Sequence, residues 1–308
     1  MGTVTLAESA KLAQDLLVAG VIESIVTVDR FFDILPFHEI SGNALKYNRE
    51  NALGDVQMLA VGGTITAKNP ATFTEVTTGL TTIIGDAEVN NLIQATRSNV
   101  TDQKAAQIMS KAKNIGLTYR NQLINGDGTG SNVEGLLALV PTSQTDINGG
   151  GGGNGAALAF SNLDWIIDNV KDKNGVVDYF QMHSRTLRSY FALLRALGGA
   201  GVGEVVTLPS GAQVPGYRGV PIFRNDNIPI TMTQGATNTC TAVIGGTLVD
   251  GSMTVGLSGL TASGDSGIRI SEVGESETKD ETITRVKMYA GLALFSELGV
   301  AMVTGVTN

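Results

Sequence analysis

The clearest amphipathic pattern in the chain lies between residues 101 and 124. Apolar side chains recur there every three or four positions, as they do along one face of a helix. The stripe consists of Ala105, Ile108, Met109, Ala112, Ile115, Tyr119 and Leu123. Thr101 is placed to cap the first turn, and Asn125-Gly126 supplies a stop. This pattern predicts a helix about 36 Å long, at 1.5 Å per residue.

Helical spacing also occurs in shorter stretches. An amphipathic helix is expected over residues 5–19, followed by a second apolar stretch that ends near Pro36. Two more helices are expected over residues 163–170 and 185–197. The helix at the start of the chain either docks on its own domain or forms an arm that packs on a neighbour.

Residues 40–85 have a different character. Turn signals such as Gly62-Gly63 and Asn69-Pro70 separate short β-prone runs there. The runs cover residues 45–49, 63–67 and 73–84, and the last is rich in Thr, Val and Ile. The pattern predicts a long two-stranded excursion that has no room for a core of its own.

An apolar run over residues 282–295 is the second long strand signal. A turn is expected at Pro215-Gly216. Shorter strand signals cover residues 133–140, 179–183, 219–224, 241–249, 267–273 and 298–306. This mixture of helices and antiparallel-type strands predicts the α+β class.

Composition changes this picture in one respect, because only 16% of the 308 residues are charged, against about 25% in an average protein. A soluble surface normally needs about 25–35% charged residues. One explanation is that much of the surface is buried against partners, since interface centres are depleted in Lys, Glu and Asp. The other is an ordinary β-rich protein with a surface of Thr, Asn and Gly. Composition leaves both open.

The net charge of −8 and the single cysteine exclude several classes of protein. Nothing resembles the basic footprint of a nucleic-acid binder. Cys240 cannot form an intrachain disulfide, which suits a reducing cytoplasm. The first twenty residues contain Glu8, Lys11 and Asp15 and lack the pattern of a secretory signal. No apolar stretch has the length that a membrane span needs.

Motifs that could carry catalysis or ligand binding do not form a site. The glycine-rich run over residues 149–155 lacks a following Lys-Ser/Thr, and the run from Gly126 to Gly130 follows a helix rather than a strand. His38 and His183 are the only histidines, and one cysteine cannot build a thiolate metal site. The carboxylates within residues 275–281 are typical of a solvated face. The sequence therefore predicts no enzyme, no cofactor and no metal site.

The order of these parts, together with four stretches of sequence, carries a resemblance to a known family. The stretches are GNALKYNRE at residues 42–50, LINGDGTGSNVEGLLAL at 123–139, GYRGVPIFRNDNIP at 216–229 and TRVKMYAGLALFSELGVAMVTGV at 284–306. The chain resembles the major capsid proteins of tailed bacteriophages, whose fold is shared with encapsulins and the herpesvirus capsid floor. The resemblance covers nearly the whole chain, and it rests on joint order and spacing rather than on any one motif.

The resemblance implies how the chain is divided. It implies an N-terminal arm (residues 1–40), an extended β-hairpin loop (41–83), a peripheral domain (84–134 and 268–297) and an axial domain (135–267 and 298–308). The helix over residues 101–124 would be the spine of the peripheral domain. The strand over residues 282–295 would pair with the strands at the base of the extended loop, and the loop would lie over a neighbouring subunit.

The resemblance also implies a structural function. The chain would assemble with itself into pentamers and hexamers of an icosahedral head that encloses viral DNA without sequence-specific binding. Contacts between subunits are expected on the extended loop, at Lys46, Tyr47, Arg49, Glu50, Lys68, Phe73 and Glu75. Lys–Asn crosslinks, which some members form, are not expected, because no acceptor Asn or catalytic Glu can be matched.

Partners and location follow from the same resemblance. A portal is implied, together with a separate scaffolding protein or none, since only residues 1–40 precede the extended loop. The shell would be assembled in the host cytoplasm and become part of the virion, without a membrane.

Three other interpretations stay open. An encapsulin-like shell would have the same fold but would enclose a cargo protein. A secreted adhesin or tail-fibre protein would suit the Thr-, Gly- and Asn-rich composition, although the missing signal and the helix over residues 101–124 count against it. A metabolic α/β enzyme would need a site, and no set of residues converges on one.

Overall fold

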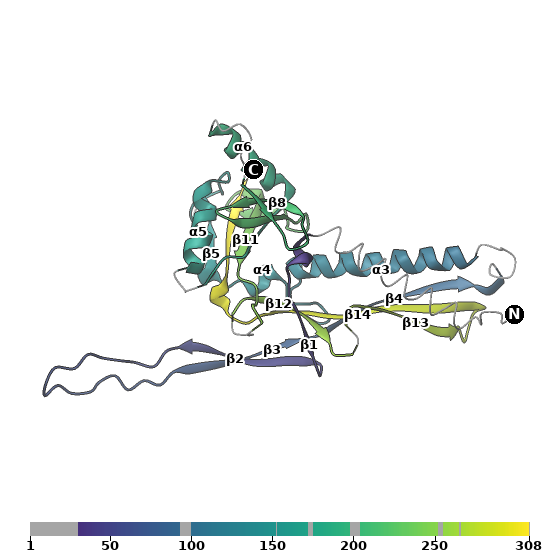
Figure 1. Cartoon of the computed structure of the whole chain (residues 1–308), viewed down its shortest axis with the longest axis horizontal. Coiled ribbons are helices and arrows are strands. Elements are labelled where there is room, and N and C mark those ends of the chain that lie inside the picture. The colour runs from purple at the N-terminus through teal and green to yellow at the C-terminus, as the bar shows by residue number, and fades with distance from the viewer. Residues whose placement is uncertain are drawn as a thin grey trace.

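The computed structural model describes residues 30–92, 100–151, 153–171, 175–197, 204–251, 255–264 and 266–307. The helix expected over residues 5–19 lies outside these described residues. The described chain has three parts: an upper lobe, an elongated part built on one long helix and long strands, and a thin ribbon that projects from below the upper lobe (Figure 1).

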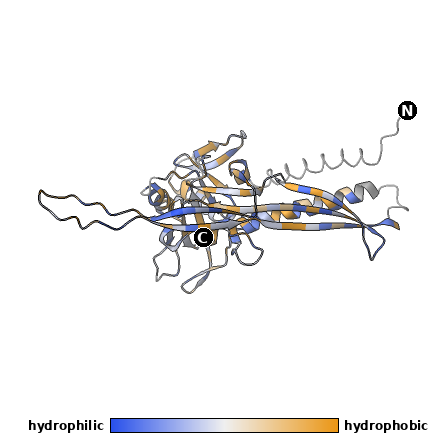
Figure 2. Cartoon of the chain, turned by 90° about the horizontal axis from the view of Figure 1, so that it is seen from below, coloured by the Kyte–Doolittle hydropathy of each residue, from blue (hydrophilic) through white to orange (hydrophobic). Residues whose placement is uncertain are grey.

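The elongated part is a five-stranded sheet arranged around one central strand. Its strands are β1 (Phe37–Ile40), β12 (Leu257–Ala262), β14 (Glu281–Leu294), β13 (Ile268–Glu275) and β4 (Thr81–Asn90). β4 pairs antiparallel with one edge of β14, while β12 and β13 follow one another along its other edge. The strand predicted over residues 282–295 is therefore confirmed. Seen from below, the ribbon continues the line of these long strands (Figure 2).

The long helix α3 (Val100–Asn125) packs on this sheet and confirms the helix predicted over residues 101–124. Its buried face meets Ala87 of β4 and Val286 of β14. The Tyr119 hydroxyl donates a hydrogen bond to the Gly291 carbonyl oxygen at 3.1 Å. The buried face consists of Ile108, Ala112, Ile115, Tyr119 and Leu123. Met109 of the predicted stripe lies off this face and is half exposed.

The upper lobe is an eight-stranded mixed sheet with two helices. Across the sheet, the strands are β5 (Thr145–Ile147), β15 (Val300–Val306), β11 (Thr237–Gly246), β6 (Tyr179–Met182), β9 (Val220–Arg224), β8 (Gln213–Tyr217) and β7 (Glu204–Thr207), and β10 (Met232–Gln234) pairs with β11. The helices α5 (Phe160–Lys171) and α6 (Ser184–Ala196) confirm those predicted over residues 163–170 and 185–197.

The strand β11 shows how this sheet divides the core. Val243 belongs to the apolar cluster that contains α5, whereas Ala242 and Ile244 belong to the cluster that contains Phe31. Successive side chains of a strand point to opposite faces of a sheet. The helix α5 and the short 3-10 helix η1 (Arg30–Asp33) therefore lie on opposite sides, and η1 occupies the corner between the upper lobe and α3 (Figure 1).

Three expectations from the sequence are wrong in detail. The run over residues 133–140 is not a strand, since it contains one helical turn, α4 (Leu136–Leu139), that buries Leu136. No strand forms over residues 63–67, which lie in the far end of the ribbon. The run over residues 73–84 is two strands, because the chain changes partner at Leu80: β3 (Thr72–Gly79) pairs with β2 (Ala44–Ala52), and β4 pairs with β14.

Two further differences concern a turn and a strand. The turn between β8 and β9 lies at Arg218-Gly219 rather than at Pro215-Gly216, and both turn residues have positive φ, 50° and 81°, as a two-residue hairpin loop requires. The strand β12 lies within the range 135–267 expected for the axial domain, yet it pairs with β14 in the elongated sheet. The remaining short elements are η2 (Thr142–Gln144) and η3 (Glu297–Gly299).

Candidate assembly interface

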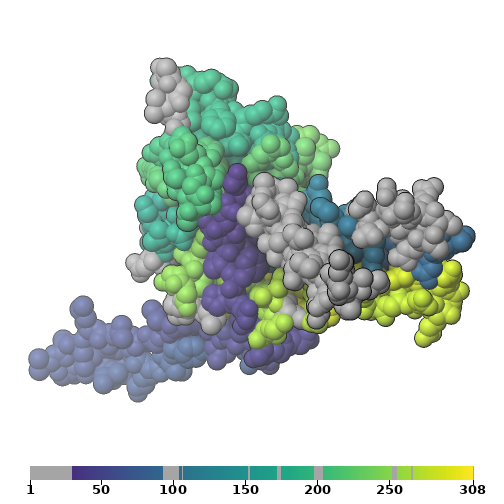
Figure 3. Space-filling view, turned by 45° about the vertical axis from the view of Figure 1, so that its right-hand side comes forward, coloured from purple at the N-terminus to yellow at the C-terminus, as the bar shows by residue number. Residues whose placement is uncertain are grey.

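The ribbon consists of β2, β3 and the tip between them, residues 53–71. The two strands pair antiparallel from Ala44↔Gly79 to Ala52↔Thr72, and within the described chain they form a sheet of two strands. In the space-filling view the ribbon stands out from the body (Figure 3). A two-stranded ribbon is at best marginally stable in water by itself, so its stability depends on what its base and its tip contact.

The base of the ribbon is fixed to the end of β14 by polar contacts. The Tyr47 hydroxyl donates to the Leu294 carbonyl at 2.8 Å, and Arg49 Nε donates to the Phe295 carbonyl at 3.1 Å. The Arg49 guanidinium also forms an ion pair with Glu297, and the ring of Tyr47 lies 5.1 Å from that of Phe295. Leu294 is the last residue of β14 and Phe295 follows it, so these bonds hold the base of the ribbon in one direction relative to the body.

The opposite side of β2 faces solvent and carries an ion pair within the ribbon. Lys46 Nζ lies 2.8 Å from a carboxylate oxygen of Glu75. The hydrogen bond and the negative charge of Glu75 raise the pKa of Lys46. Both side chains are largely exposed, and pairs of this kind contribute little to stability. The pair instead favours the observed register between β2 and β3.

The tip has no strand pairing and takes its shape from Gln57. Its Oε1 accepts hydrogen bonds from the backbone N–H of Thr66 at 2.6 Å and of Ala67 at 2.7 Å. Its Nε2 donates to the Thr64 carbonyl at 3.2 Å. One side chain thus bridges the two arms of the tip, farther out than the backbone hydrogen bond from the Asp55 N–H to the Asn69 carbonyl at 3.0 Å.

The tip also exposes large apolar side chains. Val56 is 94% exposed, Leu53 is 78% exposed, and Met58 and Val61 are fully exposed. Soluble monomers rarely expose apolar patches of more than roughly a few hundred Å², and larger ones mark sites of protein interaction. The tip is therefore the best candidate for a contact with another protein.

Comparisons with known proteins agree with this geometry. No protein-family model matches the chain. The major capsid protein of Enterobacteria phage HK97 is 29% identical over 151 residues, which is 47% of this chain and 37% of that protein. A structure of the capsid of cyanophage A-1(L) superposes with a TM-score of 0.67, at 12% identity, over 91% of this chain and 93% of that one.

The chain has the major capsid fold of tailed phages. The same fold occurs in the holo-SrpI encapsulin complex of Synechococcus elongatus PCC 7942, with a TM-score of 0.67 at 16% identity, over 90% of this chain and 87% of that one. A virus-like particle from Pyrococcus furiosus has a TM-score of 0.56 at 9% identity, over 94% and 98%. The match to the phage HK97 protein spans just over a third of that protein's length, whereas the structural matches span most of each chain.

Within this capsid fold, the seven residues expected at subunit contacts divide into three groups. Tyr47 and Arg49 contact their own chain, and Lys46 and Glu75 contact each other. The others, Glu50, Lys68 and Phe73, are exposed on the ribbon. The apolar residues of the tip were not among these seven, although the sequence shows Val56, Met58 and Leu59 as large apolar side chains of the extended loop.

No group of three or more His, Cys, Asp and Glu side chains that could hold a metal ion occurs among the described residues. His183 caps α6, where its Nδ1 accepts from the Arg185 N–H at 3.0 Å, and burial lowers its pKa. Cys240 is buried. Of the helices that the structure describes, none combines the length and apolar character of a membrane span.

Proposed function

We propose that this chain is the major structural subunit of an icosahedral phage head, and that it assembles with itself into pentamers and hexamers around viral DNA. The observation that carries the proposal is the ribbon, which exposes an apolar tip and is fixed at its base to a body with the capsid fold. A neighbouring copy supplies the surface that the tip lacks in the single chain. The likeness to phage capsid proteins supports this assignment.

The parts of the chain then have distinct roles in the shell. Residues 41–83 are the extended loop, residues 84–134 and 268–297 the peripheral domain, and residues 135–267 and 298–308 the axial domain around the symmetry axes. The pairing of β12 with β14 supports moving that strand to the peripheral domain. Residues 1–40 form the N-terminal arm.

The partners in this proposal are other copies of the chain, a portal and a separate scaffolding protein. DNA is enclosed rather than bound by sequence, and the protein is structural rather than enzymatic. Assembly takes place in the host cytoplasm, and the product is the virion head. Residues Glu50, Lys68 and Phe73 on the exposed part of the ribbon support a contact between subunits, while Tyr47 and Arg49 act by orienting the ribbon.

Deleting the ribbon tip tests the assembly role. Tyr47 and Leu80 pack near Phe295 in a small core cluster, so the deletion must spare the base. We expect a variant in which residues 53–71 are replaced by Asn-Gly, a strong hairpin turn, to keep the circular dichroism of the folded chain. It should remain a monomer or form loose capsomers in analytical ultracentrifugation. Closed shells from this variant would contradict the proposal.

An encapsulin-like shell is the second candidate, because the likeness to an encapsulin is as strong as that to a phage capsid. Negative-stain microscopy of the purified protein separates both candidates from an adhesin, since closed polyhedral shells form in the first two cases only. The contents then decide between them: nuclease-protected DNA indicates a phage head, and a co-purifying cargo protein indicates an encapsulin.

A further inference from the structure

Asparagine followed by glycine occurs four times in the chain, at residues 125–126, 148–149, 154–155 and 174–175. In such a pair the backbone nitrogen of the glycine can attack Cγ of the asparagine side chain, because glycine has no Cβ to obstruct the approach. The attack needs a free glycine N–H and a side-chain amide that is free to turn toward it. Residue 174 lies outside the described residues, so the first three pairs can be compared.

The pair at the end of α3 is held by hydrogen bonds on both groups. The Gly126 N–H donates to the Gln122 carbonyl at 2.9 Å. Asn125 Nδ2 donates to Asn121 Oδ1 and to the Asn227 carbonyl, each at 2.8 Å. Local structure that must open before a reaction protects the groups it contains, so this pair is protected.

The Asn148 side chain is held just as firmly, and the residue is only 8% exposed. Its Nδ2 donates to the carbonyls of Ala156 at 2.6 Å and Ala157 at 3.0 Å. Its Oδ1 accepts from Asn162 Nδ2 at 3.1 Å. To reach the Gly149 nitrogen, Cγ would have to turn away from all three partners, so this pair is protected as well.

Asn154 differs from both, because it is exposed and held by a single side-chain bond in the described part of the chain. Its Oδ1 accepts from the Ala236 N–H at 2.9 Å. Its Nδ2 has no hydrogen-bond partner among the described residues, and neither has the Gly155 N–H. The bond to Oδ1 favours attack at Cγ, because negative charge develops on that oxygen as the nitrogen adds.

We propose that Asn154 is a site of spontaneous modification, at which asparagine is converted to aspartate and isoaspartate through a succinimide formed with Gly155. The Gly155 nitrogen forms a bond to Asn154 Cγ and gives up its proton, the Cγ–Nδ2 bond breaks, and Nδ2 leaves as ammonia. Water then opens the ring. Cleavage between the nitrogen and Cγ gives aspartate, whereas cleavage between the nitrogen and the main-chain carbonyl gives isoaspartate. The two steps consume water and release ammonia, and nothing is oxidised or reduced.

The isoaspartate product disturbs the contact between this loop and β15. Isoaspartate carries the main chain through its own side chain, which adds a methylene to the backbone before Gly155. That glycine has no room to shift, since an added Cβ would lie 2.4 Å from the Gly305 carbonyl oxygen. The same carbonyl accepts from the Ala156 N–H at 3.0 Å, and the Thr307 N–H donates to the Ala156 carbonyl at 3.0 Å. Formation of isoaspartate therefore weakens these two bonds, whereas aspartate adds charge and leaves the backbone unchanged.

Ageing the purified chain in warm, mildly alkaline buffer tests the site. Peptide mapping by mass spectrometry should find the mass gain of deamidation at Asn154 about tenfold or more faster than at Asn125 and Asn148, because each hydrogen bond that must open slows the attack. Asn154→Gln is the control, since its longer side chain would have to close a larger ring, and it should stay unmodified. Equal rates at the three asparagines, or no mass gain at Asn154, would overturn the site.

Amide hydrogen exchange tests the effect on β15. The isoaspartate-containing fraction of the aged protein, separated by chromatography, should exchange the amides of Ala156 and Thr307 about tenfold faster than the fresh chain, because weakened hydrogen bonds protect them less. Asn154→Asp is the matched control: it carries the same added charge on an unlengthened backbone and should exchange like the fresh chain. Unchanged exchange in the isoaspartate fraction, or equal acceleration in Asn154→Asp, would overturn the proposed weakening.

Discussion

At the scale of single residues, Gln57 is exposed, yet its side chain holds the two arms of the ribbon tip together. Its side chain joins the two arms of the tip beyond the backbone hydrogen bond from the Asp55 N–H to the Asn69 carbonyl. We expect Gln57→Ala to raise amide hydrogen exchange of Thr66 and Ala67 by about tenfold, since each net hydrogen bond contributes about 1 kcal/mol. The free energy of unfolding of the body should stay unchanged. Gln107→Ala, on the exposed side of α3, is the control, and equal exchange in both variants would show that the tip does not depend on Gln57.

At Gly155, both the local backbone conformation and a neighbouring backbone atom leave no room for a side chain. Its φ is +79°, and an added Cβ would lie 2.4 Å from the Gly305 carbonyl oxygen of β15. We expect Gly155→Ala to lower the free energy of unfolding by about 1–3 kcal/mol, the range for a strained backbone position. Chemical denaturation measures the change.

Gly151 provides the matched control for that substitution. An added Cβ there has no described atom within 4 Å, and the residue does not have positive φ. Gly151→Ala should therefore leave stability unchanged within about 0.5 kcal/mol, as most surface substitutions do. Equal losses at both positions would show that the loop is sensitive as a whole rather than at Gly155.

At the scale of elements, the glycine-rich loop between β5 and α5 has two anchored ends and a glycine segment between them. Asn148 Nδ2 donates to the carbonyls of Ala156 at 2.6 Å and Ala157 at 3.0 Å, which closes the base of the loop. Asn154 Oδ1 accepts from the Ala236 N–H at 2.9 Å. The glycines between these anchors, residues 150–153, are the part that can be shortened.

Removing residues 150–153 should therefore leave both stability and assembly intact. Loop length itself has a small effect, since each doubling adds about 0.6 kcal/mol of closure entropy. Thermal unfolding and negative-stain microscopy would check the two halves of the prediction. A stable chain that no longer forms shells would show that these glycines contact a neighbouring subunit.

At the scale of the whole molecule, the distribution of charge matters more than its sum. The chain has a net charge of −8, yet the helix α6 contains Arg185, Arg188 and Arg195 and no Asp or Glu. Non-specific DNA affinity comes from many phosphate contacts made together, and one helix on one subunit offers few. We expect isolated subunits to bind duplex DNA more weakly than micromolar at physiological salt. A gel shift at micromolar protein would contradict this.

The sequence by itself determined the long elements of this protein. The 3.6-residue spacing of apolar side chains predicted α3, α5 and α6, because a helix that buries one face has apolar residues at that period. The apolar run over residues 282–295 predicted β14. The sequence also indicated that residues 41–83 lack a core of their own. The order of these parts was enough for the resemblance to phage capsid proteins, which the fold bears out.

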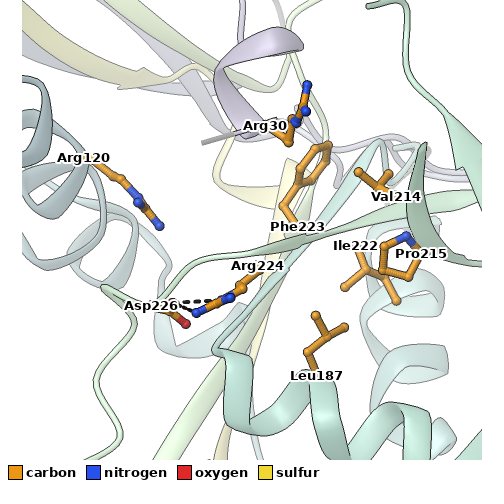
Figure 4. Close-up of a pocket in the computed structure, with 9 residues that line it drawn as sticks. All are labelled: Arg30, Arg120, Leu187, Val214, Pro215, Ile222, Phe223, Arg224 and Asp226. Atoms are coloured by element: carbon orange, nitrogen blue, oxygen red, sulfur yellow. Dashed lines mark hydrogen bonds and ion pairs between the residues drawn. The ribbon is translucent and has the colours of Figure 1, made fainter. Parts of the chain in front are cut away.

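Only the tertiary structure decided which surfaces meet. The strand is interrupted at Leu80 because the chain changes there from one strand partner to another. The helical turn α4 forms because Leu136 is buried. Neither feature has a signal in the neighbouring sequence. The roles of Tyr47 and Arg49 depend on carbonyls almost 250 positions away. A cavity between the upper lobe and α3 brings Arg30, Arg120 and Arg224 together from three elements (Figure 4). Contacts between residues so far apart depend on how the sheets pack, and the spacing of apolar and polar residues along the chain does not predict them.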